Sequence, residues 1–146
     1  MTTTPDAGGQ PDPPILASTD AGVHAALGIS VVEVSADRAV VTVPVTERVH
    51  QPYGLLHGGV SALLAESAAS IGGAASVPAG KAVVGIELNA SHLHSVRRGT
   101  LTAVATPLRK GRTIQVWDIA VSDDADRLIC QARCTLAVVD APTVTP

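Results

Sequence analysis

Hydrophobic positions recur with a strand-like pattern in the first part of the chain. Valine dominates the stretches ISVVEVS (29–35) and RAVVTVPVT (38–46), which a short connection separates. Valine-rich runs joined in this way predict a β-hairpin. Pro44 cannot donate a hydrogen bond to a neighbouring strand, so we expect the second strand to lie at an edge or to bulge there.

The pattern changes after residue 57, where Ala, Ser and Leu replace the β-branched residues. This composition favours helix over strand and predicts a helix from Gly58 to about Ser76. Gly72 and Gly73 weaken its last turns, and Pro78 ends it. One long helix is therefore expected after the first two strands.

Four strand candidates follow this helix, with no helix between them. They are KAVVGIELNASHLH (81–94), TLTAVATPL (100–108), RTIQVWDIAVS (112–122) and RLICQARCTLAVV (127–139). Strands connected this closely predict an antiparallel sheet, and the last one, apolar in places on both faces, should be central in it. The order of elements predicts an α+β fold in which a curved antiparallel sheet wraps the long central helix.

The first residues of the chain have a different composition. Residues 1–14 are polar and rich in Pro and Gly, so we expect a disordered tail before a single domain that spans residues 15–146. A short helix should open that domain, with Thr19 or Asp20 as its cap and Gly28 as its stop.

Composition narrows the classes of function. Of 146 residues, 46% are hydrophobic and 16% are charged, the net charge is −3, and there are one Trp, one Tyr and no Phe. A globular fold follows, and no nucleic-acid partner is expected, because the chain has neither a basic stripe nor aromatic residues for base stacking. No apolar run approaches the roughly 20 residues that cross a membrane, and the N-terminus lacks a secretion signal.

The two cysteines indicate a reducing compartment. Cys130 and Cys134 lie four residues apart on a predicted strand, so they share a face but are separated by roughly 13 Å of strand rise. This separation is too large for a disulfide. Reduced thiols and a cytoplasmic location are therefore expected.

One acid stands alone in the long helix. Glu66 is the only Asp, Glu, Lys or Arg between residues 49 and 80, and its neighbours three and four residues away are Ala62, Leu63, Ala69 and Ser70. A buried, unpaired carboxylate is costly, and proteins keep one mainly where it has a function, so Glu66 is a candidate catalytic group. The alternative is that Glu66 faces solvent on the polar side of an amphipathic helix.

The start of the same helix supports the catalytic interpretation. The sequence HGG places uncovered backbone N–H groups at the positive end of the helix dipole, where they can polarise a carbonyl oxygen. Glu66 follows two turns later with Ser70 on its face, so we expect donor, acid and hydroxyl to border one acyl carbon. Gln51 donates to the same carbonyl or is an ordinary turn residue. We expect His57 to make a hydrogen bond that fixes the loop; general base and ligand are the alternatives.

Two further groups of polar residues suggest ligand contacts. Arg109 to Arg112 read RKGR at a tight turn, where cations around a glycine suit phosphate, although a solvated turn is the ordinary alternative. The stretch SHLHS places His92 and His94 on one strand face. No cysteine or carboxylate pair completes a metal site there, so we expect no metal.

The chain as a whole resembles the hotdog-fold acyl-CoA thioesterases. The resemblance covers residues 28 to 139 and is carried by QPYGLLHGG, LAES, VVGIELNASHLHSVRRG, LRKG and QVWDIAVSDDADRLICQARCTLAV. These stretches are most similar to a PaaI-like branch, with the 4-hydroxybenzoyl-CoA, 1,4-dihydroxy-2-naphthoyl-CoA and enterobactin proofreading thioesterases. The resemblance implies protomers joined edge to edge, usually as a dimer of dimers, with active sites at the dimer interface.

The resemblance also implies residue roles. The family's catalytic carboxylate, a nucleophile or a general base, falls on Glu66, and the backbone N–H that polarises the thioester falls on Gly58. The orienting amide falls on Gln51 and the histidine of the HGG loop on His57. The hydroxyl that positions water or substrate falls on Ser70.

Substrate contacts of the family fall on three stretches and on a second serine. These positions are Ser67, Gly85, His92, Leu93, His94, Ser95, Arg109, Lys110, Gly111, Arg112, Thr113 and Ile114. The family carries Arg where this chain has His94, and a small hydroxyl residue where it has Arg112, so which cation holds which phosphate of coenzyme A is open.

We therefore expect a hydrolase of acyl-CoA thioesters that uses no metal and no organic cofactor. Small residues along the helix, Ala68, Ala69, Gly72 and Gly73, suggest a roomy acyl site. An aromatic acyl group such as 1,4-dihydroxy-2-naphthoyl is favoured, while a medium aliphatic chain and an acyl carrier protein as carrier stay open. The alternatives are a hotdog dehydratase or hydratase and a non-catalytic acyl-CoA binding module.

Overall fold

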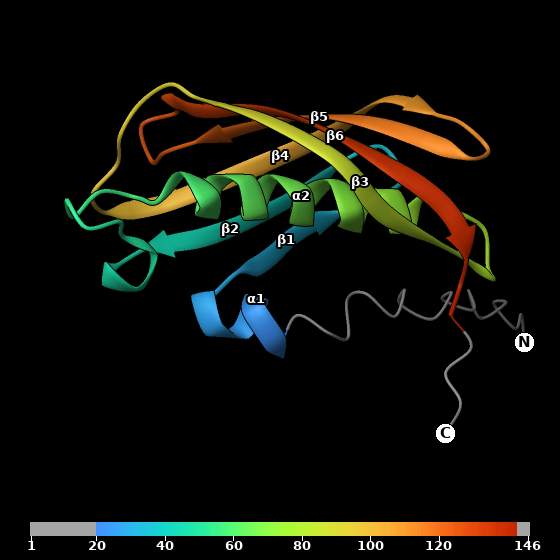
Figure 1. Cartoon of the computed structure of the whole chain (residues 1–146), viewed down its shortest axis with the longest axis horizontal. Helices are drawn as coiled ribbons and strands as arrows, with labels where there is room; N and C mark the ends of the chain where they lie inside the picture. The colour runs from blue at the N-terminus through green and yellow to red at the C-terminus, as the bar shows by residue number, and fades with distance from the viewer. Residues whose placement is uncertain (1–19, 143–146) are drawn as a thin grey trace, which may run out of the picture.

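The order of elements along the chain matches the predicted order. The computed structural model describes residues 20–142, so the tail expected at 1–14 lies outside the described part. The helices are α1 (Gly22–Leu27), the short 3-10 helix η1 (Glu47–Val49) and α2 (Gly58–Ala75). The strands are β1 (Ser30–Val34), β2 (Ala39–Val45), β3 (Lys81–His92), β4 (Gly99–Lys110), β5 (Ile114–Ser122) and β6 (Leu128–Asp140). The predicted long helix, the hairpin and the four later strands are confirmed (Figure 1).

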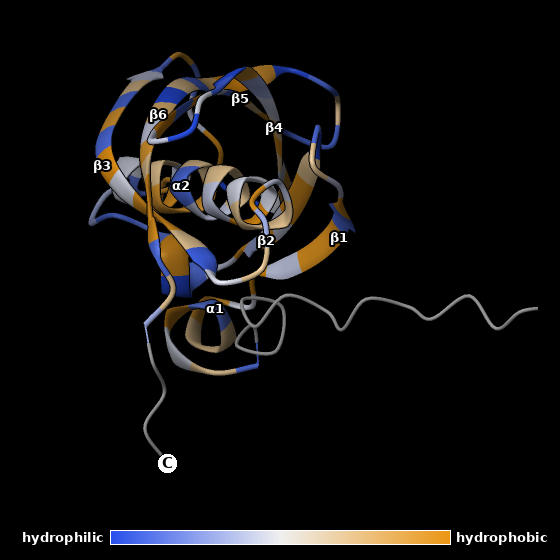
Figure 2. Ribbon diagram, turned by 90° about the vertical axis from the view of Figure 1, so that its right-hand side faces the viewer, coloured by the Kyte–Doolittle hydropathy of each residue, from blue (hydrophilic) through white to orange (hydrophobic). Residues whose placement is uncertain are grey.

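The six strands form one antiparallel sheet that curls around α2. The strand order is β1-β2-β4-β5-β6-β3, and every neighbouring pair is antiparallel. β6 lies between two strands, as its apolar sequence predicted, and β1 and β3 form the two edges. Seen end-on in Figure 2, the sheet leaves one side of α2 open between these edges, and α1 lies across that opening. The expected α+β hotdog fold is confirmed.

Pro44 lies in a strand with two neighbours but has only one at its own position. The pairing of β1 with β2 ends at Thr42, whereas β4 pairs with β2 through Pro44 to Val45. Pro44 is therefore exposed at a point of β2 where the pairing with β1 has already ended. The expected edge position is confirmed locally, although β2 as a whole is an inner strand.

The short helix α1 stops where predicted but starts differently. Gly28 ends it with a φ of 73°, and the N–H of Gly28 donates to the carbonyl of Ala25. Its N-cap is Ala21, without a side-chain hydrogen bond, so the prediction of Asp20 as cap is wrong, and Thr19 lies outside the described residues. The helix begins one residue later than expected, which leaves the carboxylate of Asp20 outside the cap position.

Small residues on the buried face of α2 let the sheet approach closely. A Cβ on Gly72 would lie 2.7 Å from the ring of Trp117, and one on Gly73 would lie 2.5 Å from Leu136. Ala68 and Ala69 are fully buried beside them. The expectation that these four residues provide a roomy acyl site is wrong, because they fill the contact between helix and sheet.

The two cysteines lie in the core part of β6. Cys130 and Cys134 are free and buried, which confirms that they form no disulfide with each other. Burial raises the pKa of both thiols, and for Cys134 burial together with the carboxylates of Glu66 and Glu87 raises the pKa to about 12. Both thiols are therefore protonated at neutral pH and unreactive.

Candidate active site

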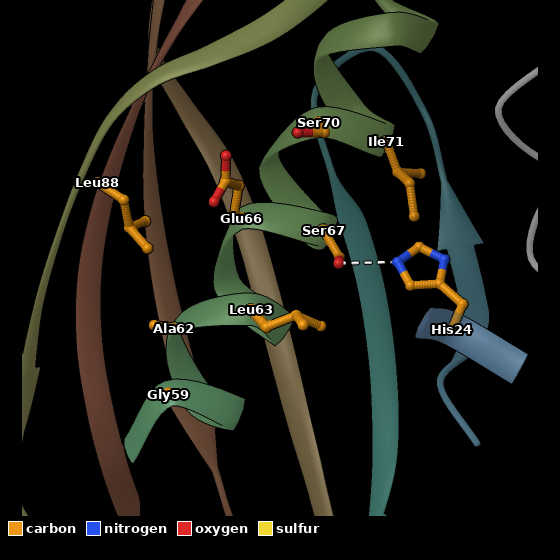
Figure 3. A pocket seen from close by; sticks show the side chains of 9 residues that line it. All are labelled: His24, Gly59, Ala62, Leu63, Glu66, Ser67, Ser70, Ile71 and Leu88. Atoms are coloured by element: carbon orange, nitrogen blue, oxygen red, sulfur yellow. Dashed lines mark hydrogen bonds between the residues drawn. The ribbon is translucent and has the colours of Figure 1, made fainter. Parts of the chain in front are cut away.

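Glu66 lies on α2 beside the edge strand β3, at the border of the side of the helix that the sheet leaves open (Figure 3). Its side chain is half-buried and makes no hydrogen bond or ion pair within residues 20–142. It borders a cavity of about 480 Å³. The lining residues, shown in Figure 3, are His24, Gly59, Ala62, Leu63, Glu66, Ser67, Ser70, Ile71 and Leu88. The acid and both predicted serines thus share one cavity.

The edge strand β3 approaches Glu66 at a glycine. A Cβ on Gly85 would overlap the Oε1 atom of Glu66, so no side chain fits there without moving the acid. The pairing of β3 with β6 shifts its register between Gly85 and Glu87, which marks a bulge at this place. Gly85, expected among the substrate contacts, lies directly against the carboxylate.

A second cavity of about 380 Å³ opens at the start of α2. It holds Gln51, Gly58 and the predicted strand-end stretch, with the lining residues Gln51, Leu55, Leu56, Gly58, Ser61, His92, Leu93, His94, Ser95 and Ile129. A Cβ on Gly58 would lie 2.9 Å from the Nε2 atom of His92, so the first glycine of HGG is needed for this imidazole to approach the helix start.

Two predicted loop residues are held in place by hydrogen bonds. His57 is the N-cap of α2, and its Nδ1 atom accepts a hydrogen bond of 2.9 Å from the N–H of Gly59. His57 thus makes a hydrogen bond at the start of α2, of the kind that the sequence predicted. The Oε1 atom of Gln51 accepts from the backbone N–H of Tyr53, which leaves the amide N–H₂ of Gln51 to donate elsewhere.

One chain does not bring all predicted catalytic groups together. Glu66 and Ser70 line the first cavity, whereas Gln51 and Gly58 line the second. Glu66 follows Gly58 by eight residues, which is about 12 Å along a helix axis. The expectation that donor, acid and hydroxyl border one acyl carbon is therefore not met within a single chain.

The RKGR turn lies at the opposite end of α2 from the second cavity. Gln115, just after the turn, donates a hydrogen bond to Ser76 at the C-terminal end of α2. Lys110 forms an ion pair with Asp37 and donates to the carbonyl of Ala36, so its charge is engaged with the β1–β2 turn. Arg109 and Arg112 are exposed and form no ion pair within residues 20–142.

Hydrogen bonds to backbone atoms hold other residues of the turn and of the SHLHS stretch. The N–H of Gly111 donates to Ile114, and the carbonyl of Thr113 accepts from Val138. The Nδ1 atom of His94 lies 2.8 Å from the carbonyl oxygen of Leu128. In the described part of the chain no three His, Cys, Asp or Glu side chains are grouped so as to hold a metal ion.

His24 is a residue of this site that sequence reasoning missed. It lies on α1 and reaches Ser67, 43 residues later, with 2.9 Å between Nε2 and Oγ. No motif surrounds it, and among the elements of residues 20–142 only α1 crosses the open side of α2 (Figure 2). Only the tertiary arrangement reveals that it lines the cavity of Glu66.

Comparisons with known proteins agree with this fold. The Thioesterase superfamily model matches residues 53–130. A 1,4-dihydroxy-2-naphthoyl-CoA hydrolase of Listeria monocytogenes is 49% identical over 117 residues, which cover 80% of this chain and 95% of that protein. Among residues 20–142, no helix is long and apolar enough to cross a membrane.

Solved structures of thioesterases have the same fold as this chain. A thioesterase from Haemophilus influenzae superposes with a TM-score of 0.83 at 39% identity, covering 90% of this chain and 92% of that one. A Glu-to-Ala variant of the protein SAV0944 from Staphylococcus aureus gives a TM-score of 0.76 at 36% identity, covering 79% and 96%. The chain belongs to the thioesterase superfamily.

Proposed function

We propose that the protein hydrolyses acyl-CoA thioesters in an active site shared by two copies of the chain. The observation that carries the proposal is the unpaired, half-buried carboxylate of Glu66 in a cavity on the open side of α2. A carboxylate held in this way is available as a nucleophile or a base. Relatives named as CoA-thioester hydrolases support the reaction class.

The arrangement of β3 beside α2 suggests how two chains complete the site. Along β3, Val83 lies next to Gly73, Gly85 next to Glu66, and His92 next to Gly58, so strand and helix run in opposite directions. An antiparallel pairing of β3 with the same strand of a second copy brings the His92 end of one chain to the Glu66 region of the other. The two groups of catalytic residues then meet across the interface.

The exposed edge of β3 supports this pairing. The strand has twelve residues and, in the part of the chain that the structure describes, only one neighbour, β6. Val84 and Ile86 are 47% and 57% exposed along it. A long edge strand with exposed apolar residues is a site for pairing with another strand. We propose dimers of this kind, two of which associate into a dimer of dimers.

In the proposed reaction, the donors come from one chain and the acid from the other. The N–H of Gly58 and the amide of Gln51 polarise the thioester carbonyl. Glu66 then attacks the carbonyl carbon, coenzyme A leaves as the thiolate, and water hydrolyses the resulting mixed anhydride. In the general-base route, Glu66 instead takes a proton from a water that Ser70 holds, and that water attacks. Neither route uses a metal or an organic cofactor.

Coenzyme A is proposed to lie between the strand end at His92 to Ser95 and the turn at Arg109 to Ile114. Arg109 and Arg112 are the cations available for its phosphates, since Lys110 is paired with Asp37. The two stretches lie at opposite ends of α2 in one chain and become neighbours only in the proposed dimer. The two reduced thiols suit the cytoplasm as the location.

The proposed acyl group is aromatic. The relatives from Listeria monocytogenes and Escherichia coli are 1,4-dihydroxy-2-naphthoyl-CoA hydrolases by name, which supports a hydroxylated aryl ester for this chain. The variants of the Staphylococcus aureus thioesterase replace a glutamine and a glutamate that are separated along their chain by the same distance as Gln51 and Glu66, which supports these two positions as functional.

The test is thiol release from a panel of aryl and aliphatic CoA thioesters by the wild type and by Glu66→Gln. We expect aryl esters to be cleaved fastest and the variant to lose at least about 10²-fold in kcat, because the amide is neither nucleophile nor base. Light scattering should give the mass of a dimer or tetramer.

Thiol release by Glu66→Gln at the wild-type rate would contradict the role of Glu66. Binding of CoA esters without thiol release would instead identify a binding module. A monomer at the concentrations at which the enzyme is active would contradict the shared site.

A further inference from the structure

We infer that His24 and Ser67 form a polar subsite of the acyl cavity that hydrogen-bonds a hydroxyl group on the acyl moiety. His24 Nε2 lies 2.9 Å from Ser67 Oγ, and both residues line the cavity that holds Glu66 (Figure 3). The inference rests on the proposed function, because it concerns recognition of the acyl group in the same cavity.

The pair and the catalytic acid border the same cavity but point in different directions from α2. In Figure 3, Glu66 points toward the strand that carries Leu88, whereas Ser67 points toward α1 and His24. The cavity is otherwise lined by small or apolar residues apart from Ser70. An acyl group with its thioester carbon at Glu66 therefore meets apolar walls except at Ser70 and at the His24–Ser67 pair.

The pair retains capacity for one more hydrogen bond in either tautomer of His24. If Nε2 of His24 accepts the Ser67 proton, the serine oxygen keeps a lone pair that can accept from a substrate hydroxyl. If Nε2 carries a proton and donates it, the Ser67 hydroxyl is free to donate. A phenolic hydroxyl both donates and accepts, so it fits the pair in both cases.

The same contact fixes the wall of the cavity. No residue of α1 is buried, and the helix has no side-chain cap at its start. Leu27 packs partly against the core, and the His24–Ser67 contact joins the helix to α2. Loss of the contact should loosen the wall for every substrate, whereas loss of the subsite should affect only hydroxylated ones.

The experiment compares benzoyl-CoA with the three monohydroxybenzoyl-CoA isomers. We expect the wild type to prefer one hydroxylated isomer in kcat/KM. Ser67→Ala and His24→Leu should lower that preference about three- to tenfold, the range of one partly exposed hydrogen bond. His24→Gln, which keeps a donor and an acceptor, should retain most of it.

Val23→Ala is the matched control, since Val23 lies on the same helix, is 49% exposed and does not line the cavity. It should keep the wild-type preference. Thermal melting of each variant checks that the fold is retained.

The ratio of dissociation constants for hydroxylated and plain esters, measured in the Glu66→Gln background, tests the subsite independently of turnover. An unchanged ratio in both Ser67→Ala and His24→Leu would overturn the subsite, while leaving a hydrolase that releases thiol untouched. Absence of thiol release with a variant-sensitive binding ratio would instead keep the subsite and overturn the hydrolase.

Discussion

The carboxylate of Glu66 rests against the backbone of β3 because residue 85 is a glycine. A Cβ at this position would overlap the carboxylate oxygen, and the strand bulges there relative to β6. Bulges often re-aim side chains next to active sites. Gly85 therefore limits the directions in which the carboxylate of Glu66 can point.

Gly85→Ala should lower kcat about 10- to 100-fold with little change in stability, because the added methyl group displaces the carboxylate from its productive position. Glu66→Asp should also lose activity, since its carboxylate is one methylene short. In the double variant the shorter acid makes room for the methyl group. We therefore expect the double variant to be no slower than the worse single variant, in a double-mutant cycle on kcat.

If the fold-losses in kcat of the two single variants multiply in the double variant, Gly85 and Glu66 act independently. That result would contradict the close approach of residue 85 to the carboxylate. Thermal melting of all three variants serves as the control, because a folding defect in Gly85→Ala would lower the melting temperature whichever residue stands at position 66.

Some site residues could be identified from the sequence, and others only from the structure. Glu66 stands out because no other charge lies near it in the sequence, and a hydrogen bond of His57 is expected from its place at a helix start. His24 and the contact of Gly85 with the acid depend on segments that are distant along the chain. Such contacts leave no local pattern, so the sequence could not predict them.

At the scale of elements, the β4–β5 turn separates cations that look equivalent in the sequence. Lys110 is held by Asp37 and by the carbonyl of Ala36, so it ties this turn to the β1–β2 turn. Arg109 and Arg112 remain exposed. The turn thus combines a structural cation with two that are available to a ligand.

Arg112→Met should raise KM for CoA esters about three- to tenfold with kcat nearly unchanged, because a contact to a phosphate contributes to binding rather than to chemistry. Lys110→Met is the matched control. It should leave KM near the wild-type value and cost at most about 1 kcal/mol of stability, as expected for an exposed ion pair. A larger rise of KM in Lys110→Met than in Arg112→Met would reverse the assignment.

The elements themselves were predictable, but their faces were not. The β-branched runs and the Ala-rich helix gave all six strands and α2. The side chains of α2 are small or apolar on nearly all sides of the helix. Its composition therefore does not tell which side packs against the sheet. The composition therefore suggests an acyl site at Ala68, Ala69, Gly72 and Gly73. In the structure both alanines are fully buried, Gly72 packs against Trp117 and Gly73 packs against Leu136.

At the scale of the whole molecule, the two groups of site residues predict complementation between inactive variants. Glu66→Gln and Gln51→Ala should each disable both sites of the proposed homodimer. In a mixed dimer, one site carries both substitutions and the other carries neither. Random pairing makes half of the dimers mixed, so refolding an equal mixture should restore about a quarter of wild-type thiol release.

The control mixture combines Glu66→Gln with Glu66→Ala, in which no site can be intact, and it should stay inactive. If the first mixture also stays inactive while mass spectrometry shows mixed dimers, then Gln51 and Glu66 belong to the same site within one chain.

The fluorescence of the single tryptophan reports on the packing of α2 against the sheet. Trp117 is fully buried under Gly72, and its indole N–H donates to Gln115. The chain has one Trp and one Tyr, and the Tyr, Tyr53, is 83% exposed. Excitation above the tyrosine absorption band therefore reports on one indole, and its emission records whether the helix is seated in the sheet, without any added label.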